Sequence, residues 1–245
     1  MKQYEAVITT LERLGGIATL GQLNQEVFKI EDCQWKTKTP FASIRRIVQQ
    51  NTDIYKIKPG LYGLKSHKKQ NEAQGIFEEH SGNKNSKESV EFNHSYYQGL
   101  IITIGNLRKF DTYLPNQDKN KLFLSEKLGE LSSLDHIPDF SYKYLVQRSS
   151  TIDVIWFNER KMPHSFFEVE HSTDIQNSLL KFIDLQDFYS RMFIVADQKR
   201  KKEFETKMSF TALKEIKNRV EFLDYGGLTR QYEQAIESLS FPVQI

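Results

Sequence analysis

The sequence predicts a two-domain protein of the α/β (α+β) class, in which a small domain of helices and a hairpin precedes a mixed central sheet flanked by helices. Residues 1–66 carry three helical repeats of apolar side chains and then two short alternating strands. Residues 67–93 are mostly polar and have no apolar period, which is typical of an extended flexible linker. In residues 94–245 helical periods alternate with β-rich runs, which is the pattern of a sheet covered by helices.

Composition places the chain among soluble globular proteins. Of its 245 residues, 38% are hydrophobic and 27% are charged, and no run approaches the roughly 18 apolar residues that a membrane span needs. The first residues form an amphipathic pattern rather than a signal peptide, so we expect a cytoplasmic protein without membrane partners. The single cysteine, Cys33, excludes an internal disulfide and a zinc site built from several cysteines.

Charge is distributed unevenly along the chain. Residues 1–70 contain 12 Lys/Arg and 6 Asp/Glu, whereas the remaining 175 residues contain 22 Lys/Arg and 26 Asp/Glu. A basic small domain suggests a polyanion as partner, and a solvated charged surface is the alternative interpretation. The two parts of the chain therefore have different expected tasks.

The small domain is predicted to contain three helices and one hairpin. Apolar residues recur at helical spacing in QYEAVITTL, and two glycines end that helix. Thr19 can cap a second helix over TLGQLNQEVF, and Pro40 occupies the first turn of a third over PFASIRRIVQQN. Two short strands, DIYKIK and LYGLK, then pair through a Pro-Gly turn.

Three helices and a terminal hairpin within about 65 residues resemble the winged helix-turn-helix modules of DNA-binding proteins. The basic third helix and the wing-like IYKIKPGLYGLK carry the resemblance. In that family the third helix enters the major groove and the hairpin touches the phosphate backbone. The resemblance implies double-stranded DNA as partner, although winged helices also serve as dimerisation or protein-docking modules. The implied DNA-binding residues are Lys38, Ser43, Arg45, Arg46, Gln49, Lys56 and Lys58.

Two β-rich runs in the second domain carry three acidic residues. STIDVIWF contains Asp153, and SFFEVE, which follows after the polar turn NERKMPH, contains Glu168 and Glu170. Side chains alternate along a strand, so the two glutamates project from one face. Antiparallel pairing of the two runs can place Asp153 beside Glu168. We therefore expect the three carboxylates to share one small volume.

A divalent cation resolves the electrostatic conflict of such a cluster. Burying a carboxylate among apolar side chains costs on the order of several kcal/mol, and neighbouring like charges raise the pKa values further. A hard cation supplies the opposite charge and prefers carboxylate oxygens. This indicates Mg²⁺, with Mn²⁺ as a substitute. The alternative is an exposed edge hairpin whose acids face water.

The order of elements resembles the core of the PD-(D/E)xK nuclease superfamily, to which many restriction endonucleases belong. The stretch IDVIWF…FFEVEHSTDI…LLKFIDL…MFIVAD carries the resemblance, which covers roughly residues 94–210. The resemblance implies that Asp153 and Glu168 are catalytic residues that bind the metal ion. Glu170 stands where the family most often has lysine, and it would position or deprotonate the attacking water.

The missing lysine leaves two explanations for activity. The chain is similar to the minority of these nucleases with Glu-x-Glu, or a basic group arrives from elsewhere. Lys181, eleven residues after Glu170 in the following predicted helix, can reach back to the site as a catalytic residue. The alternative is a solvated lysine on an amphipathic helix.

Together the resemblances imply a Mg²⁺-dependent DNA endonuclease of restriction or defence type, whose winged helix recognises the DNA. Cutting both strands requires two active centres, which implies a homodimer or sequential nicking. Two alternatives stay open. One is a DNA-binding or regulatory protein that keeps the nuclease fold with weak or no turnover. The other is a nuclease that acts on RNA or another nucleic-acid intermediate.

Overall fold

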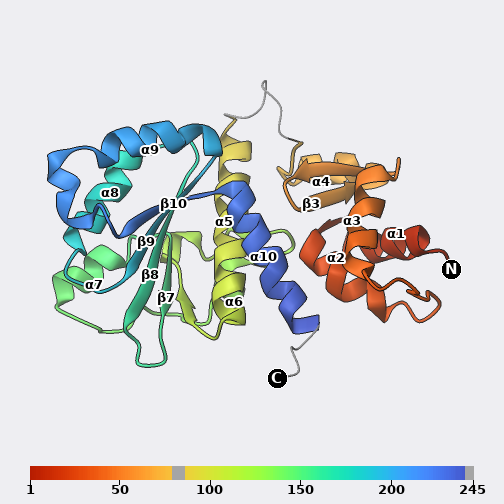
Figure 1. Ribbon diagram of the computed structural model, residues 1–245, viewed down its shortest axis with the longest axis horizontal. Coiled ribbons are helices and arrows are strands. Elements are labelled where there is room, and N and C mark those ends of the chain that lie inside the picture. The colour runs from red at the N-terminus through yellow and green to blue at the C-terminus, as the bar shows by residue number, and fades with distance from the viewer. Residues whose placement is uncertain (79–85, 241–245) are drawn as a thin grey trace. The chain divides into compact units, whose positions relative to one another are not determined.

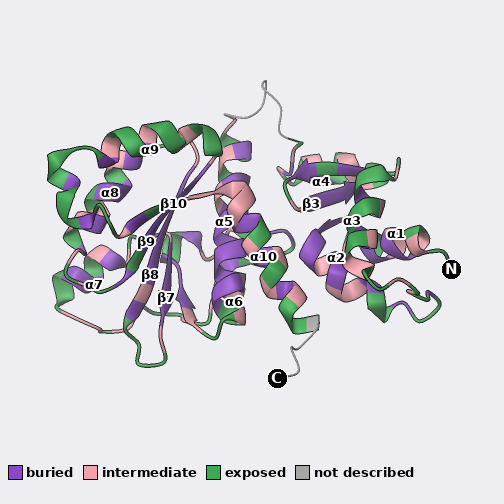
Figure 2. Ribbon diagram, viewed as in Figure 1, coloured by how far each residue is buried: buried purple, intermediate pink, exposed green. Residues whose placement is uncertain are grey.

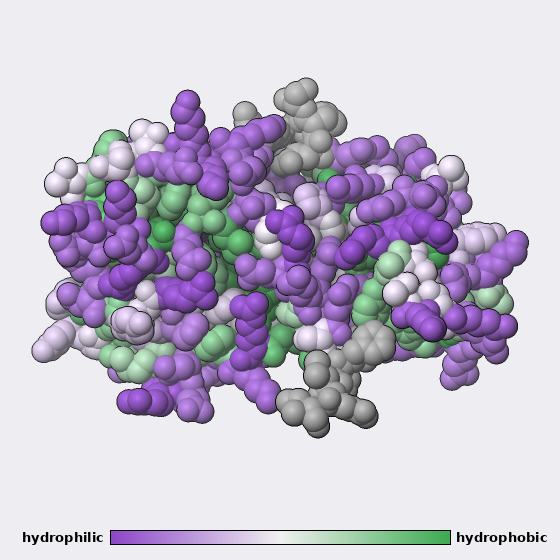
Figure 3. Space-filling model, viewed as in Figure 1, coloured by the Kyte–Doolittle hydropathy of each residue, from purple (hydrophilic) through white to green (hydrophobic). Residues whose placement is uncertain are grey.

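A computed structural model describes residues 1–78 and 86–240. The chain forms two compact units: Met1–Ser89 together with the residues from Thr229 onward, and Val90–Leu228 (Figure 1). Each unit has its own hydrophobic core. Hydrophilic side chains cover most of the face shown in Figure 3. None of the helices in the described ranges combines the length and the apolar character that a membrane crossing requires.

The first unit combines helices with an antiparallel sheet of strand order β1-β3-β2. Its core is made by apolar side chains from α1, α2, α3 and the sheet. In chain order its elements are α1 (Gln3–Arg13), β1 (Ile17–Thr19), α2 (Leu20–Glu26), η1 (Val27–Lys29), α3 (Pro40–Gln50), β2 (Ile54–Lys58), β3 (Leu61–Leu64), η2 (Lys65–His67) and α4 (Lys68–Ala73).

The three predicted helices and the predicted hairpin are all observed in the first unit. α1 is followed by Gly15 and Gly16, whose positive φ angles of 83° and 86° suit the residue type that ends a helix. The Thr19 hydroxyl caps α2 by accepting a hydrogen bond from the backbone N–H of Gln22 at 3.0 Å. Strand β1 was not predicted, because three residues are too few to show an alternating pattern.

From Thr229 onward, α10 (Tyr225–Ser240) belongs to the first unit, although it lies far away in the sequence. The hydroxyl oxygen of Tyr232 lies 3.1 Å from that of Thr19, and Asn24 donates to Glu237 at 3.3 Å. The predicted second domain, residues 94–245, differs from the second unit in this helix. Its return to the first unit depends on contacts between distant residues, which local patterns do not report.

The predicted linker, residues 67–93, is helical at both ends. α4 lies at its start and α5 (Lys87–Leu107) begins inside it, whereas residues 79–85 lie outside the described residues. α4 is held by a buried side chain, since Asn71 donates to the hydroxyl oxygen of Tyr55 at 3.1 Å. A single buried asparagine in a polar helix leaves no apolar period, so the sequence pattern could not indicate it.

The second unit is built around a mixed sheet of strand order β10-β9-β8-β7-β4, as the predicted α/β (α+β) class requires. The helices and strands of this unit follow one another along the chain. After α5 they are β4 (Asp111–Tyr113), η3 (Asn116–Asp118), β5 (Leu122–Phe123), β6 (Glu126–Lys127), α6 (Leu128–Leu131), α7 (Lys143–Ser149), β7 (Val154–Phe157), β8 (Pro163–Glu170), α8 (Ile175–Asp184), β9 (Arg191–Ala196), η4 (Gln198–Arg200), α9 (Lys201–Met208), η5 (Thr211–Ile216) and β10 (Val220–Asp224).

Helices cover both faces of this sheet, and Figure 2 shows its central strands as buried. On one face, apolar side chains of α8 and α9 pack against those of β7, β8 and β9. On the other face, the indole N–H of Trp156 donates to the backbone carbonyl of Ile101 in α5 at 3.2 Å. The strands that carry the predicted acids are therefore central and covered, so the alternative of an exposed edge hairpin is wrong.

The register of β7 and β8 positions these acids. The two strands are antiparallel, with Val154 opposite Phe167, so Asp153, directly before β7, comes next to Glu168. Phe167 stacks on Phe193 with ring centroids 4.8 Å apart, on the face that also holds Trp156. Glu168 and Glu170 point to the opposite face, where α8 lies, as strand alternation predicts.

Candidate active site

The four predicted catalytic residues line one pocket of about 280 Å³ in the second unit. Asp153 comes from the loop before β7, Glu168 and Glu170 from β8, and Lys181 from α8. The pocket also includes His94 of α5 and Ser178 of α8. Four segments of the chain thus converge on one small volume.

Lys181 neutralises the carboxylate of Glu168. Its ammonium nitrogen lies 2.9 Å from both carboxylate oxygens and also donates to the backbone carbonyl of Thr151 at 2.9 Å. Ser178, one helical turn before Lys181, donates to Oε2 of Glu168 at 2.8 Å. Only 2% of Glu168 is exposed, so these contacts replace the water that a surface carboxylate would have.

Glu170 is held by hydroxyl groups. Ser178 and Thr173 each donate a hydrogen bond to its carboxylate. Burial raises the pKa of Glu170, and the two hydroxyl donors offset part of this effect. Ser178 contacts both glutamates, so it fixes the position of one carboxylate relative to the other.

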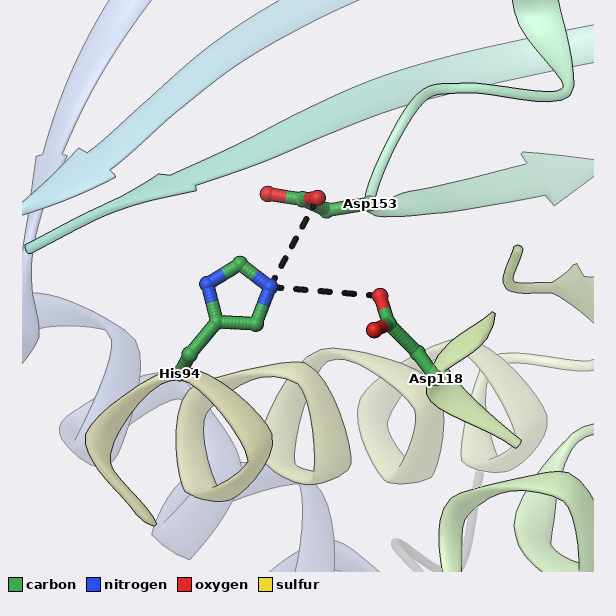
Figure 4. A group of neighbouring side chains, drawn as sticks. All are labelled: His94, Asp118 and Asp153. Atoms are coloured by element: carbon green, nitrogen blue, oxygen red, sulfur yellow. Dashed lines mark ion pairs between the residues drawn. The ribbon is translucent and has the colours of Figure 1, made fainter. Parts of the chain in front are cut away.

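Asp153 faces a second group of polar side chains (Figure 4). Its Oδ2 accepts a hydrogen bond from the backbone N–H of Val169 at 2.8 Å, and its Oδ1 lies 3.6 Å from Nε2 of His94. The same imidazole nitrogen lies 4.0 Å from Oδ2 of Asp118 in η3. Gln98 donates to Asp118 Oδ2 at 2.8 Å and to the backbone carbonyl of Asp153 at 3.2 Å.

His94 and Asp118 were not among the residues that the sequence indicated. His94 and Gln98 are four residues apart on α5 and therefore share one face of that helix, which was an available signal. Asp118 lies in a short 3₁₀ turn within the polar tract PNQDKNK, where no periodicity marks it. Its role in the site depends on the packing of η3 against α5, which only the fold shows.

The surroundings separate the pKa values of the two neighbouring acids. Burial, together with the charge of Asp153, raises the pKa of Glu168 to about 8, against the lowering effect of Lys181 and Ser178. Burial also acts to raise the pKa of Asp153, but His94, the backbone N–H of Val169 and Lys181 together outweigh it and the pKa is lowered. Burial acts to lower the pKa of His94, but Asp153 and Asp118 outweigh it and the pKa is raised.

In metal-free protein, the free energy of unfolding should fall as the pH rises from 4.5, the ordinary pKa of Glu168, to about 8. Because the pKa is raised in the folded state, that state binds more protons than the unfolded chain in this window. A difference of one pKa unit between the folded and unfolded states changes the free energy of unfolding by about 1.4 kcal/mol. In a chain of this size, a change of about 1 kcal/mol in that free energy shifts Tm by about 2–4 °C.

Thermal unfolding in a chelator at several pH values measures this effect. Glu168→Gln, which cannot ionise, should lose most of the fall in Tm between these pH values. Glu205→Gln, at an exposed position of α9, should keep it. An unchanged pH profile in Glu168→Gln would show that Glu168 ionises in the folded protein as it does in water.

The residues predicted to bind DNA are distributed over two environments. Six of them are exposed or half-buried in the first unit: Lys38 in the segment before α3, Ser43, Arg45, Arg46 and Gln49 on α3, and Lys56 on β2. The seventh, Lys58, is only 3% exposed, whereas Lys56 on the same strand is exposed. The β2–β3 register is irregular between Lys56 and Lys58, and simple alternation therefore fails there.

Arg45 is already paired with acidic side chains of α10. Its guanidinium lies 3.1 Å from Glu233 and 3.9 Å from Glu237, both within the first unit. Burial raises the pKa of Glu233, and Arg45 opposes this change. Any anion that binds Arg45 must therefore compete with these two carboxylates.

A mixed sheet and a pocket lined by three carboxylates characterise the second unit as an α/β domain with a cluster of acidic side chains. Residues 76–240 match the family model described as the Type II restriction enzyme NmeDI C-terminal domain, and the chain belongs to this family. The description of this family names the C-terminal domain of a restriction enzyme.

A curated relative is the Type II restriction enzyme NmeDI of Neisseria meningitidis serogroup C. It is 28% identical over 127 residues, which cover 47% of this chain and 36% of the relative. The alignment thus spans about a third of the relative's length. No solved structure gives a significant match.

Proposed function

We propose that this protein is a metal-dependent DNA endonuclease of restriction type, with a PD-(D/E)xK-like site formed by Asp153, Glu168, Glu170 and Lys181. The observation that carries the proposal is the ion pair of Lys181 with Glu168, in the same pocket as Asp153 and Glu170. It supplies, from α8, the positive charge that is absent from the position of Glu170. The similarity to a Type II restriction enzyme supports phosphodiester hydrolysis in DNA.

The donor set of the pocket fits a divalent cation. Asp153, Glu168 and Glu170 place three carboxylates around a volume of about 280 Å³. Mg²⁺ and Mn²⁺ prefer oxygen ligands of this kind, and Asp153 would hold such an ion. When bound, the cation supplies positive charge that polarises the scissile phosphate and favours ionisation of a water molecule.

The protein side chains divide the remaining tasks. Lys181 holds a positive charge where the phosphate gains negative charge in the transition state. Burial raises the pKa of Glu170, which makes its carboxylate a stronger base toward the attacking water. Ser178 is a positioning residue, because it donates to both glutamates.

DNA recognition is assigned to the first unit. Its order of helices and strands supports the assignment of a winged helix-turn-helix, in which α3 would be the recognition helix and the β2–β3 hairpin the wing. Lys38, Ser43, Arg45, Arg46, Gln49 and Lys56 are then the contacts to duplex DNA. Double-strand cleavage by one site per chain requires a homodimer or two successive nicks.

Arg46→Ala should weaken DNA binding and reduce the slope of log affinity against log salt by about 1, because one phosphate contact is lost. Arg45→Ala should have a smaller effect, since Glu233 and Glu237 already offset its charge. Arg13→Ala, at an exposed position of α1, is the matched control and should leave affinity and slope unchanged. Binding to a labelled duplex at several salt concentrations measures both quantities. Equal slopes in all three variants would contradict the assigned recognition surface.

Incubation of the full chain with methylated and unmethylated genomic DNA tests the proposed activity. In Mg²⁺ or Mn²⁺ we expect fragments with defined ends, and in a chelator we expect intact DNA. RNA in a parallel reaction should stay intact. DNA binding without cleavage in every metal tested would instead support a second candidate function, a DNA-binding protein without turnover. The feature that favours this candidate is Glu170, which stands at the position where the family most often has lysine.

A further inference from the structure

We propose that the metal ion of this pocket is bound by His94 and Asp118 together with Asp153, and that this mixed nitrogen and oxygen site selects Mn²⁺ over Mg²⁺. The proposal deepens the proposed nuclease function and rests on it for the role of the ion. It replaces Glu168 by a ligand set that the sequence did not indicate.

The three residues present ligand atoms at spacings that suit one ion. Nε2 of His94 lies 3.6 Å from Asp153 Oδ1 and 4.0 Å from Asp118 Oδ2. All three ligand atoms lie within 4.8 Å of one another. With bonds of about 2.1 Å, neighbouring ligands of an octahedral ion are about 3 Å apart and opposite ones about 4.2 Å. The two distances from the imidazole lie inside this range.

Each carboxylate directs one oxygen to the imidazole while the protein holds its other oxygen, and in Asp118 the oxygen that faces the imidazole also accepts a hydrogen bond from Gln98. Asp153 accepts the N–H of Val169 with Oδ2, and its Oδ1 faces His94. Asp118 pairs with Lys121 through Oδ1 at 2.7 Å, and its Oδ2 faces His94. In Figure 4 the imidazole points from α5 toward both carboxylates.

Glu168 is less suited to be a ligand in this arrangement. Both of its oxygens lie 2.9 Å from the ammonium group of Lys181, and Oε2 also accepts the hydroxyl of Ser178. Binding a cation there would bring two positive groups to one carboxylate. The negative charge of Glu168 is already compensated, whereas Asp153 Oδ1 is not contacted by a lysine or arginine among the described ion pairs.

Gln98 provides an independent indication of a missing ligand. Its side chain is fully buried, and Nε2 is held by Asp118 Oδ2 and by the carbonyl of Asp153. Its Oε1 has no hydrogen-bond partner among the described residues. A buried amide oxygen without a donor is unfavourable, and a nearby cation or its water would supply the missing partner.

The imidazole decides which cation is preferred. Mg²⁺ is bound mainly by oxygen ligands and water, whereas first-row transition ions such as Mn²⁺ accept imidazole nitrogen together with carboxylates. Replacing one carboxylate by His94 therefore lowers the affinity for Mg²⁺ more than for Mn²⁺.

Isothermal titration of metal-free full chain with MnCl₂ and with MgCl₂ tests the ligand set. The wild type should bind Mn²⁺ at least about tenfold more tightly than Mg²⁺. His94→Ala and Asp118→Asn should each weaken Mn²⁺ binding by about 10–100-fold, a range typical for residues that support a metal. Glu168→Gln and the exposed His136→Ala should stay within about threefold of the wild type.

A spectroscopic readout keeps the test independent of folding defects. Pulsed EPR of bound Mn²⁺ should show nitrogen-14 modulation from the imidazole, and this should vanish in the milder variant His94→Gln. Unchanged Mn²⁺ binding in both His94 variants, or loss of binding in Glu168→Gln alone, would overturn the proposal.

Failure of the ligand set differs from failure of the nuclease function. DNA cleavage with unchanged Mn²⁺ affinity in His94→Ala overturns only the ligand set. Mn²⁺ binding that depends on His94, without cleavage of any DNA, overturns only the nuclease.

Discussion

Lys181→Met is expected to lower the rate of DNA cleavage by about 10²–10³-fold while leaving DNA affinity nearly unchanged. The substitution keeps an apolar stem of similar length but removes the ammonium group that lies 2.9 Å from both oxygens of Glu168. Loss of one charge-stabilising donor in an active site typically costs this factor in turnover. Single-turnover cleavage of a plasmid, together with duplex binding in the absence of metal, measures the two quantities.

Lys207→Met is the matched control for this substitution. The side chains of Lys207 and Lys181 are equally exposed, at 23%, and Lys207 also pairs with an acid, Asp174, at 3.4 Å. Its loss should change the cleavage rate by less than about threefold. Lys181→Arg retains the charge and should recover part of the rate. Equal rates in the two methionine variants would exclude Lys181 as the basic group of the site.

Asp153→Asn is expected to lower cleavage by at least about 10³-fold and to weaken binding of the divalent cation. The change replaces one oxygen and removes the negative charge. The side-chain amide still offers an oxygen to the N–H of Val169, so the β7–β8 geometry is retained. A carboxylate that contacts the cation cannot be replaced by a neutral amide without loss of the attraction between them.

Asp111→Asn controls for the general effect of removing an aspartate from this sheet. Asp111 lies on β4 and pairs with Lys161 at 2.6 Å, away from the pocket. Its replacement should leave cleavage and metal binding unchanged. Cleavage by Asp153→Asn at the wild-type rate would remove the central acid from the mechanism. Thermal unfolding of both variants checks that the fold is intact.

The sequence indicated those parts of the fold that depend on local patterns. The spacing of apolar residues, within one element or across two elements that are adjacent in the chain, predicts the helices of the first unit, its hairpin and the pair β7–β8. The common face of Glu168 and Glu170 follows from strand alternation. The proximity of Lys181 to the glutamates could be predicted because α8 directly follows β8 in the chain.

Features that depend on distant contacts were outside the reach of these patterns. Asp118 enters the site because Gln98 holds its carboxylate from another helix. Lys58 is buried next to an irregularity in the pairing of β2 with β3, and no residue type in the sequence indicates this irregularity. The proposed metal ligands therefore come from a helix, a turn and a loop whose proximity is a property of the folded chain.

The return of α10 to the first unit has a consequence for fragment design. The backbone passes between the two units twice, near Ser89–Val90 and near Leu228–Thr229, so the second unit is an insertion within the first. A recombinant piece that stops before Thr229 would leave Thr19, Asn24 and Arg45 without partners that α10 supplies. The amino-terminal 89 residues are therefore not a self-sufficient module that can be excised and transplanted onto another protein.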